Sequence, residues 1–164
     1  MKQGGKTGYP PGLLQDDDRR LSRWFASRLD ARAVIRKQSI ERQITMTTEA
    51  ENLVAELRNF TGTEQYYVNP LYRWMKYTDG VKYFATKAGA YWFLDVVGTE
   101  LRDLASKEEF MTVDLIVRDG KSEILVTDGN DTVLWKRKTI VTDCPTGTYR
   151  FFLQHNVFMI NSEY

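Results

Sequence analysis

The sequence predicts an α+β domain, with N-terminal helices packed on one face of a roughly five-stranded antiparallel meander sheet. Apolar side chains recur at helical spacing up to about residue 105, and from residue 111 onward they alternate along successive segments. Helices followed by a run of hairpins are typical of the α+β class. At 164 residues, the chain is long enough for one hydrophobic core and too short for two comfortable domains.

The helical part of the domain begins with a pattern typical of a helix start. Thr48, with Glu51 three positions later, has the spacing of a capping box, in which each side chain bonds the backbone N–H at the other position. Gly62 and Gly89 mark two helix ends, since glycine adopts the left-handed conformation that closes a helix. We therefore expect helices over residues 48–59, about 80–88 and about 90–105.

The strands are predicted from a two-residue period and from turn residues. Asp119-Gly120 provides the positive φ angles of a tight hairpin, and 128–131 is a second turn signal. Pro70 argues against a central strand in the tyrosine-rich stretch before it, which we interpret as a loop or short edge piece. Residues 73–77 are a candidate short strand. The strands of the meander are expected at about 111–118, 122–127, 132–142, 148–154 and 157–161.

Charge divides the chain into a basic extension, residues 1–45, and a single α+β domain, residues 46–164. The extension holds 10 Lys/Arg against 5 Asp/Glu, and the remainder holds 13 against 17. Glycine and proline break any regular element in residues 1–18, whereas 19–44 is a basic, partly amphipathic helical stretch. Met1 and Met46 are both possible translation starts.

Composition limits the function classes. An apolar fraction of 42% and a charged fraction of 27% are those of a globular protein and not of a disordered one. No apolar run is long enough for a membrane span, and the N-terminus lacks the pattern of a secretory signal. With Cys144 and His155 as the single cysteine and histidine, we expect a cytoplasmic protein with no disulfide, no metal site and no cofactor.

Four blocks of sequence resemble a family of small bacterial, phage and mobile-element proteins known only as a domain of unknown function. The resemblance covers about residues 47–164 and implies a fold and a prokaryotic or phage origin, but no activity. The blocks are TGTEQYY at 61–67, YTDGVKYF at 77–84, AGAYWFLD at 88–95 and SEY at 162–164.

Catalytic chemistry has one weak pair of candidates. Cys144 and His155 are the nucleophile and base that the chain offers, and catalysis would require them within hydrogen-bond reach of each other. A small free thiol and a histidine in a turn explain both residues more simply. The turn at 128–131 lacks the alternating ligands and final glutamate of a calcium loop, and no phosphate-binding glycine motif occurs.

Candidate binding residues fall into an aromatic set and two basic sets. Aromatic rings can stack unpaired bases or anchor a protein partner, although core packing is their commoner role. The basic sets suit phosphate contacts, partner docking or, on an edge strand, protection from aggregation. The aromatic set is Tyr66, Tyr67, Tyr72, Trp74 and Trp92, and the basic sets are Arg28, Arg32, Arg36 and Lys37, and Lys136, Arg137 and Lys138.

These observations favour a small, non-enzymatic protein-interaction module of phage or mobile-element origin, whose partner is a host or phage protein. The first alternative is a nucleic-acid-binding accessory protein that uses the basic N-terminal segment. The second is an enzyme with an unrecognised site. The sequence leaves the partner and the oligomeric state open, and does not reveal which aromatic rings are exposed.

Overall fold

The computed structural model describes residues 14–164, and it describes their side chains except at 14–32, 43, 46, 47, 139 and 140. The chain divides into two units, Met1–Gln43 and Ile44–Tyr164. The helical elements are α1 (Leu14–Leu57), α2 (Asp79–Lys87), α3 (Tyr91–Glu100), α4 (Arg102–Ala105) and the 3₁₀ turn η1 (Asn161–Glu163). The strands are β1 (Tyr67–Val68), β2 (Lys76–Tyr77), β3 (Phe110–Arg118), β4 (Lys121–Thr127), β5 (Val133–Val141), β6 (Gly147–Gln154) and β7 (Val157–Ile160).

Helix α1 passes through the position at which a helix start was expected, and it begins at Leu14, inside the stretch 1–18 in which no regular element was expected. Thr48 lies inside the helix, and its hydroxyl donates a 3.0 Å hydrogen bond to the carbonyl oxygen of Ile44 one turn earlier. The predicted capping box is therefore wrong, because this hydroxyl bonds backward along a continuing helix. The remaining helices lie close to their expected positions, with Leu101 separating α3 from α4 and Gly89, at φ +61°, following α2.

The sheet has seven strands in the order β1-β2-β7-β6-β3-β4-β5. The α+β class is confirmed, but the sheet is larger than predicted and mixed, since β2 runs parallel to β7. The meander order is wrong at one step. Strand β6 does not pair with β5, its predecessor, but lies between β3 and β7.

The burial of each strand explains this order. In β6, Tyr149, Phe151 and Leu153 are all buried. A strand with such a large apolar surface is stabilised most at the centre of a sheet, where the core can cover it. Strand β5 lies at one edge of the sheet and carries the charged stretch 136–138. Charges on an edge strand oppose pairing with further strands.

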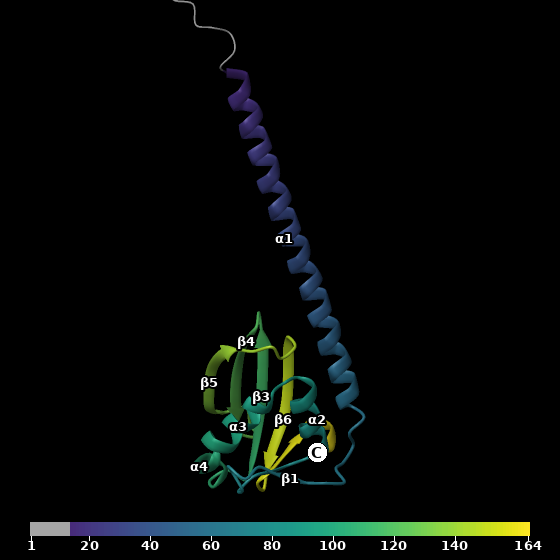
Figure 1. Ribbon diagram of the computed structural model, residues 1–164. Helices are drawn as coiled ribbons and strands as arrows, with labels where there is room; N and C mark the ends of the chain where they lie inside the picture. The colour runs from purple at the N-terminus through teal and green to yellow at the C-terminus, as the bar shows by residue number, and fades with distance from the viewer. Residues whose placement is uncertain (1–13) are drawn as a thin grey trace, which may run out of the picture. The chain divides into compact units, whose positions relative to one another are not determined.

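The core lies between one sheet face and the helices (Figure 1). The odd-numbered residues of β3, from Met111 to Val117, are fully buried against it. Phe84 of α2 and Phe93 of α3 both contact Phe151 of β6, with ring centroids 5.0 and 5.1 Å apart. This aromatic packing fixes α2 against the sheet and so gives the loops around its N-terminus a rigid support.

The predicted hairpin turn between β3 and β4 is confirmed. Asp119 and Gly120 have φ angles of +52° and +68°, as a two-residue turn between twisted strands requires. None of the helices that the structure describes has the length and apolar character needed to cross a membrane.

Candidate binding groove beside helix α2

The carboxylate of Asp79 organises the loop in front of β1. It accepts hydrogen bonds from the backbone N–H groups of Glu64 (2.9 Å) and Gln65 (3.1 Å) and from the hydroxyl of Tyr67 (2.8 Å). The hydroxyl of Thr63 lies 2.9 Å from the same carboxylate. Hydrogen bonds from Tyr67 and Thr63 first, and then those from the backbone, lower the pKa of Asp79, because each of them favours the ionised form.

Glu163 closes the other side of the N-terminus of α2. Its carboxylate accepts a 2.5 Å hydrogen bond from the hydroxyl of Thr78 and a 3.0 Å bond from the N–H of Gly80. A Cβ atom on Gly80 would lie 2.5 Å from Ile160 Cδ1 and 2.8 Å from Glu163 Oε2, so a larger residue there would displace these two side chains. The first, second and last of the four sequence blocks thus meet at the start of α2.

An open groove of about 570 Å³ lies between this loop and the exposed side of α2. Two aromatic rings line it, Phe60 and Tyr83, with centroids 5.2 Å apart. The hydroxyl of Tyr83 donates a 2.7 Å hydrogen bond to Glu56, which holds this ring in position. The other lining residues are Asn59, Thr61, Gly62, Glu64, Asp79, Lys82, Thr86 and Lys87.

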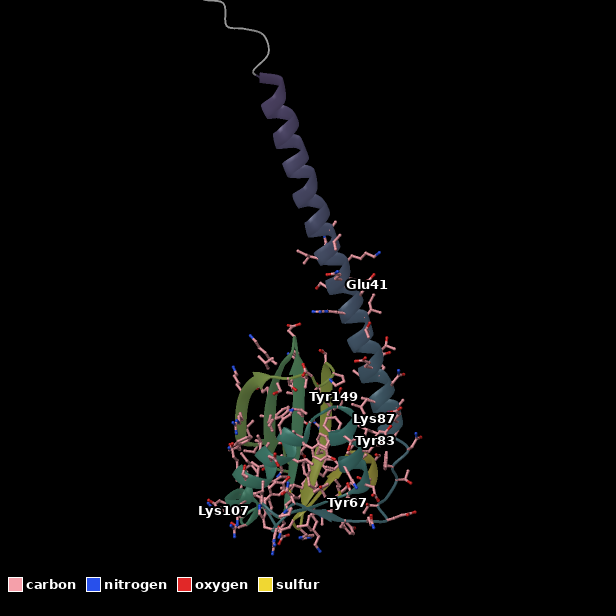
Figure 2. The ribbon with its side chains drawn as sticks, viewed as in Figure 1. Glu41, Tyr67, Tyr83, Lys87, Lys107 and Tyr149 are labelled. Carbon is pink, nitrogen blue, oxygen red and sulfur yellow. The ribbon has the colours of Figure 1, made fainter. Side chains whose placement is uncertain are left out.

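Two ammonium groups belong to the same groove. Lys82 Nζ lies 3.9 Å from the centroid of the Tyr67 ring. Lys87 Nζ lies 5.4 Å from that of Tyr83, and Figure 2 labels these two residues. Lys87 also lies 3.9 Å from the carboxylate of Glu56. The hydrogen bond to Tyr83 and the charge of Glu56 raise the pKa of Lys87, so this side chain stays protonated at neutral pH.

The groove is suited to binding and poorly suited to acid–base or nucleophilic chemistry. Asp79 is surrounded by hydrogen-bond donors, and its lowered pKa makes it a weak base. Glu64 is exposed to solvent, and Lys87, whose pKa is raised, is a protonated donor. Within the described part of the chain, no group of three His, Cys, Asp or Glu side chains could hold a metal ion.

The structure does not bring Cys144 and His155 together. Cys144 precedes β6 and His155 follows it, so the length of this strand, about 23 Å at about 3.3 Å per residue, separates them. Cys144 is buried, and burial raises the pKa of its thiol to about 12. The thiolate needed for nucleophilic attack is therefore scarce at neutral pH.

The aromatic residues predicted as binding residues are dispersed. Tyr66 is exposed, whereas Tyr67 is half-buried and stacks on Tyr77 at 5.6 Å. Tyr72 is buried, and with the half-buried Trp74 it lines a second hollow of about 440 Å³. Trp92 is half-buried and packs edge-on against the buried Phe93. Of the five candidates, Tyr67 is the one whose contacts with groove side chains the structure describes, and these contacts are with Lys82 and Asp79.

The predicted basic residues lie elsewhere. Arg28 and Arg32 fall outside the residues whose side chains the structure describes, while Arg36 and Lys37 are exposed on α1. On β5, Lys136 forms an ion pair with Glu123 and Arg137 with Glu100, and Lys138 is exposed.

Sequence reasoning missed the groove, although one signal for it was present. Lys82, Tyr83, Thr86 and Lys87 occupy one stripe of α2 at spacings of three and four residues. The buried residues of the helix, Gly80, Val81, Phe84 and Ala85, occupy the opposite side. A helix with polar residues on one side and buried residues on the other presents its polar side to solvent or to a ligand. The sequence cannot show that residues 59–64 face this stripe.

Comparisons with known proteins bear on the second unit. No curated protein and no solved structure matches the chain. Residues 51–164 match a family model, which covers more than half of the chain and includes all four blocks. The chain therefore belongs to DUF6876, a family of unknown function.

Proposed function

We propose that this chain is a small, non-enzymatic protein-interaction module that binds an extended segment of a partner protein in the groove beside α2. One observation carries this proposal: aromatic faces and ammonium groups converge in an open hollow whose Asp79 carboxylate is already engaged by hydrogen bonds. Aromatic rings held on a rigid support are effective anchors in protein interfaces, since they bury a large area with little loss of side-chain freedom.

The groove favours a segment with an apolar side chain next to a carboxylate. The Phe60 and Tyr83 rings offer an apolar surface, and Lys82 and Lys87 offer donors at its border. Glu64 and Asp79 balance these two charges within the lining. Because Asp79 is surrounded by its own donors and lies in the first turn of α2, its charge is already stabilised locally. A ligand carboxylate can therefore approach the lysines.

We further propose that the protein acts in the cytoplasm and comes from a phage or mobile element. A single buried cysteine suits a reducing compartment. The origin rests on the resemblance of the four sequence blocks. The partner is then a host or phage protein.

The test is selection of a displayed random-peptide library against the full chain, followed by titration calorimetry with the enriched peptides. We expect enriched sequences to pair an apolar residue with an acidic one. The double variant Lys82→Gln/Lys87→Gln should weaken binding about tenfold, since it removes two charged donors. Its matched control, Lys76→Gln/Lys107→Gln, removes the same charge at exposed sites outside the groove lining and should change the affinity less than twofold. Equal affinity for the groove variant and the native chain would refute the proposal.

A further inference from the structure

The sheet has a second face that the proposed groove does not use. Even-numbered residues of β3 point away from the core that α2 and α3 cover, and pairing across the sheet places their partners in β4, β5 and β6 on the same side. We call this the outer sheet face. It carries Phe110, Thr112, Asp114, Ile116, Arg118, Lys121, Glu123, Leu125, Lys136, Lys138, Arg150 and Phe152.

Positive charge is concentrated on this face of an otherwise acidic unit. Residues 44–164 contain 13 Lys/Arg and 17 Asp/Glu, a net charge of −4. The outer sheet face holds five of these cations and two of the carboxylates, a net charge of +3. The two carboxylates are both engaged, Asp114 with Arg150 and Glu123 with Lys136. The other three cations, Arg118, Lys121 and Lys138, are exposed at the end of the face that carries the β3–β4 turn.

Aromatic rings gather at the opposite end of the face. Tyr164 packs against Phe110 and Phe152, with ring centroids 5.6 and 5.1 Å away, and the two phenylalanines lie 5.4 Å apart. Tyr164 is 67% exposed, and the two phenylalanines are half-buried. Such exposed rings provide flat surfaces on which unpaired bases can stack.

The two ends are separated by eight residue steps along β3, from Phe110 to Arg118, or about 26 Å at about 3.3 Å per step. Arg150 lies between them on the neighbouring strand and remains partly exposed beside Asp114. Asp119, in the turn next to Arg118, adds one carboxylate at the basic end. Three exposed cations still outnumber it there.

We propose that the outer sheet face binds single-stranded nucleic acid, with bases stacked on the ring cluster and phosphates along the basic end. Flat rings and cations on one sheet face match a ligand that carries stackable bases and repeated phosphates, and poly-glutamate tests the alternative of an acidic peptide. A duplex keeps its bases stacked inside and offers no faces to the rings. The proposal is independent of the groove beside α2, whose residues lie on a different surface.

The experiment measures fluorescence anisotropy of labelled twelve-nucleotide dT and rU oligomers with the full chain, over a salt series. We expect binding that weakens steeply with salt. The triple variant Arg118→Gln/Lys121→Gln/Lys138→Gln should bind at least about tenfold more weakly. The slope of log affinity against log salt concentration should decrease in magnitude by about 2, because three phosphate contacts are lost. The matched control Arg73→Gln/Lys76→Gln/Lys107→Gln makes the same change in net charge at exposed positions and should stay within about twofold.

A second pair of measurements separates ring stacking from charge. Tyr164→Ser should weaken oligonucleotide binding about fivefold or more, because stacking on an aromatic ring contributes that much per base. The same variant should bind inorganic polyphosphate as the native chain does. Three results would overturn the proposal: no oligonucleotide binding by the native chain at 50 mM salt, equal losses in the two triple variants, or binding of poly-glutamate as tight as that of the oligonucleotides. Loss of binding only in Arg36→Gln/Lys37→Gln would also overturn it and assign the contact to α1.

Discussion

The hydroxyl of Tyr67 donates a 2.8 Å hydrogen bond to Asp79, twelve positions later in the chain. This bond ties the first residue of β1 to the first turn of α2. Together with the two backbone N–H bonds to the same carboxylate, it determines where residues 61–67 lie and therefore shapes one wall of the groove.

The lowered pKa of Asp79 predicts how its contribution to stability depends on pH. A carboxyl group whose pKa is lower in the folded than in the unfolded chain stabilises the fold above its ordinary pKa of about 3.9. This contribution disappears as the pH falls through the lower, folded-state pKa. Asp79→Asn should therefore melt at a lower temperature than the native chain at pH 7, and the difference should shrink below about pH 4.

Thermal melts of both proteins between pH 2 and pH 7 measure this difference. Asp103→Asn, at an exposed position, is the control and should melt like the native chain throughout. A difference for Asp79→Asn that stays constant down to pH 2 would show that its carboxylate is not the source.

Gly98 lies against the ring of Tyr72, and an added Cβ atom would be 2.3 Å from Tyr72 Cδ2. Tyr72 is 4% exposed and donates a 3.3 Å hydrogen bond to Asp95, so its ring has little freedom to move. Gly98→Ala should lower the free energy of unfolding by about 1–3 kcal/mol, as overpacking does elsewhere. In Gly62→Ala the new atom meets nothing within 4 Å, and urea denaturation should show little change. Equal stability of the two variants would contradict this packing.

Burial of Cys144 predicts slow chemical modification. Its pKa of about 12 leaves very little thiolate at pH 8, and the residue is 1% exposed. Labelling by a disulfide reagent should be at least about a hundredfold slower than in the urea-unfolded chain, in which the thiol has its ordinary pKa of about 8.5. Its rate should follow global unfolding as urea is added. Rapid labelling of the native protein would show that the thiol is accessible.

The ion pair of Asp114 and Arg150 joins β3 to β6 by two parallel hydrogen bonds of 2.8 and 2.9 Å. The Asp114 side chain is 10% exposed, so removal of its partner leaves a largely buried carboxylate without its guanidinium. Arg150→Met should destabilise the fold by about 1–3 kcal/mol, and Arg150→Lys should restore only part of this loss because lysine cannot form the paired contact. Lys136→Met, which removes the partner of the more exposed Glu123, is the control and should have no measurable effect on stability.

Local signals in the sequence predicted much of this fold. Asp119-Gly120 identified the hairpin, because few residues adopt positive φ at consecutive positions. The alternation along β3 identified its buried face. Long-range pairing was not predictable in the same way. The place of β6 beside β3 depends on how much apolar surface each strand buries in the assembled core, a property of all the strands together.

The candidate site was less predictable, for a related reason. The tyrosines of residues 66–91 were candidates for binding as well as for core packing, but the sequence did not show which rings the core would bury. Tyr72 is buried against Gly98, whereas Tyr83 lines the groove, where a hydrogen bond to Glu56 holds its ring. That difference depends on contacts between segments more than twenty residues apart. The polar stripe on α2 could be recognised from the spacing of its residues within the helix. The loop that completes the groove is positioned by hydrogen bonds to Asp79, which the sequence does not show.

The most direct test of the proposed interaction site is a nuclear magnetic resonance titration of the ¹⁵N-labelled full chain with a peptide selected from the displayed library. The account predicts that the largest amide shifts occur at Gly62, Lys82, Thr86 and Lys87, and that they are lost in Lys82→Gln/Lys87→Gln. Shifts confined to the hollow around Trp74 or to the outer sheet face would contradict it and place the protein-binding site elsewhere.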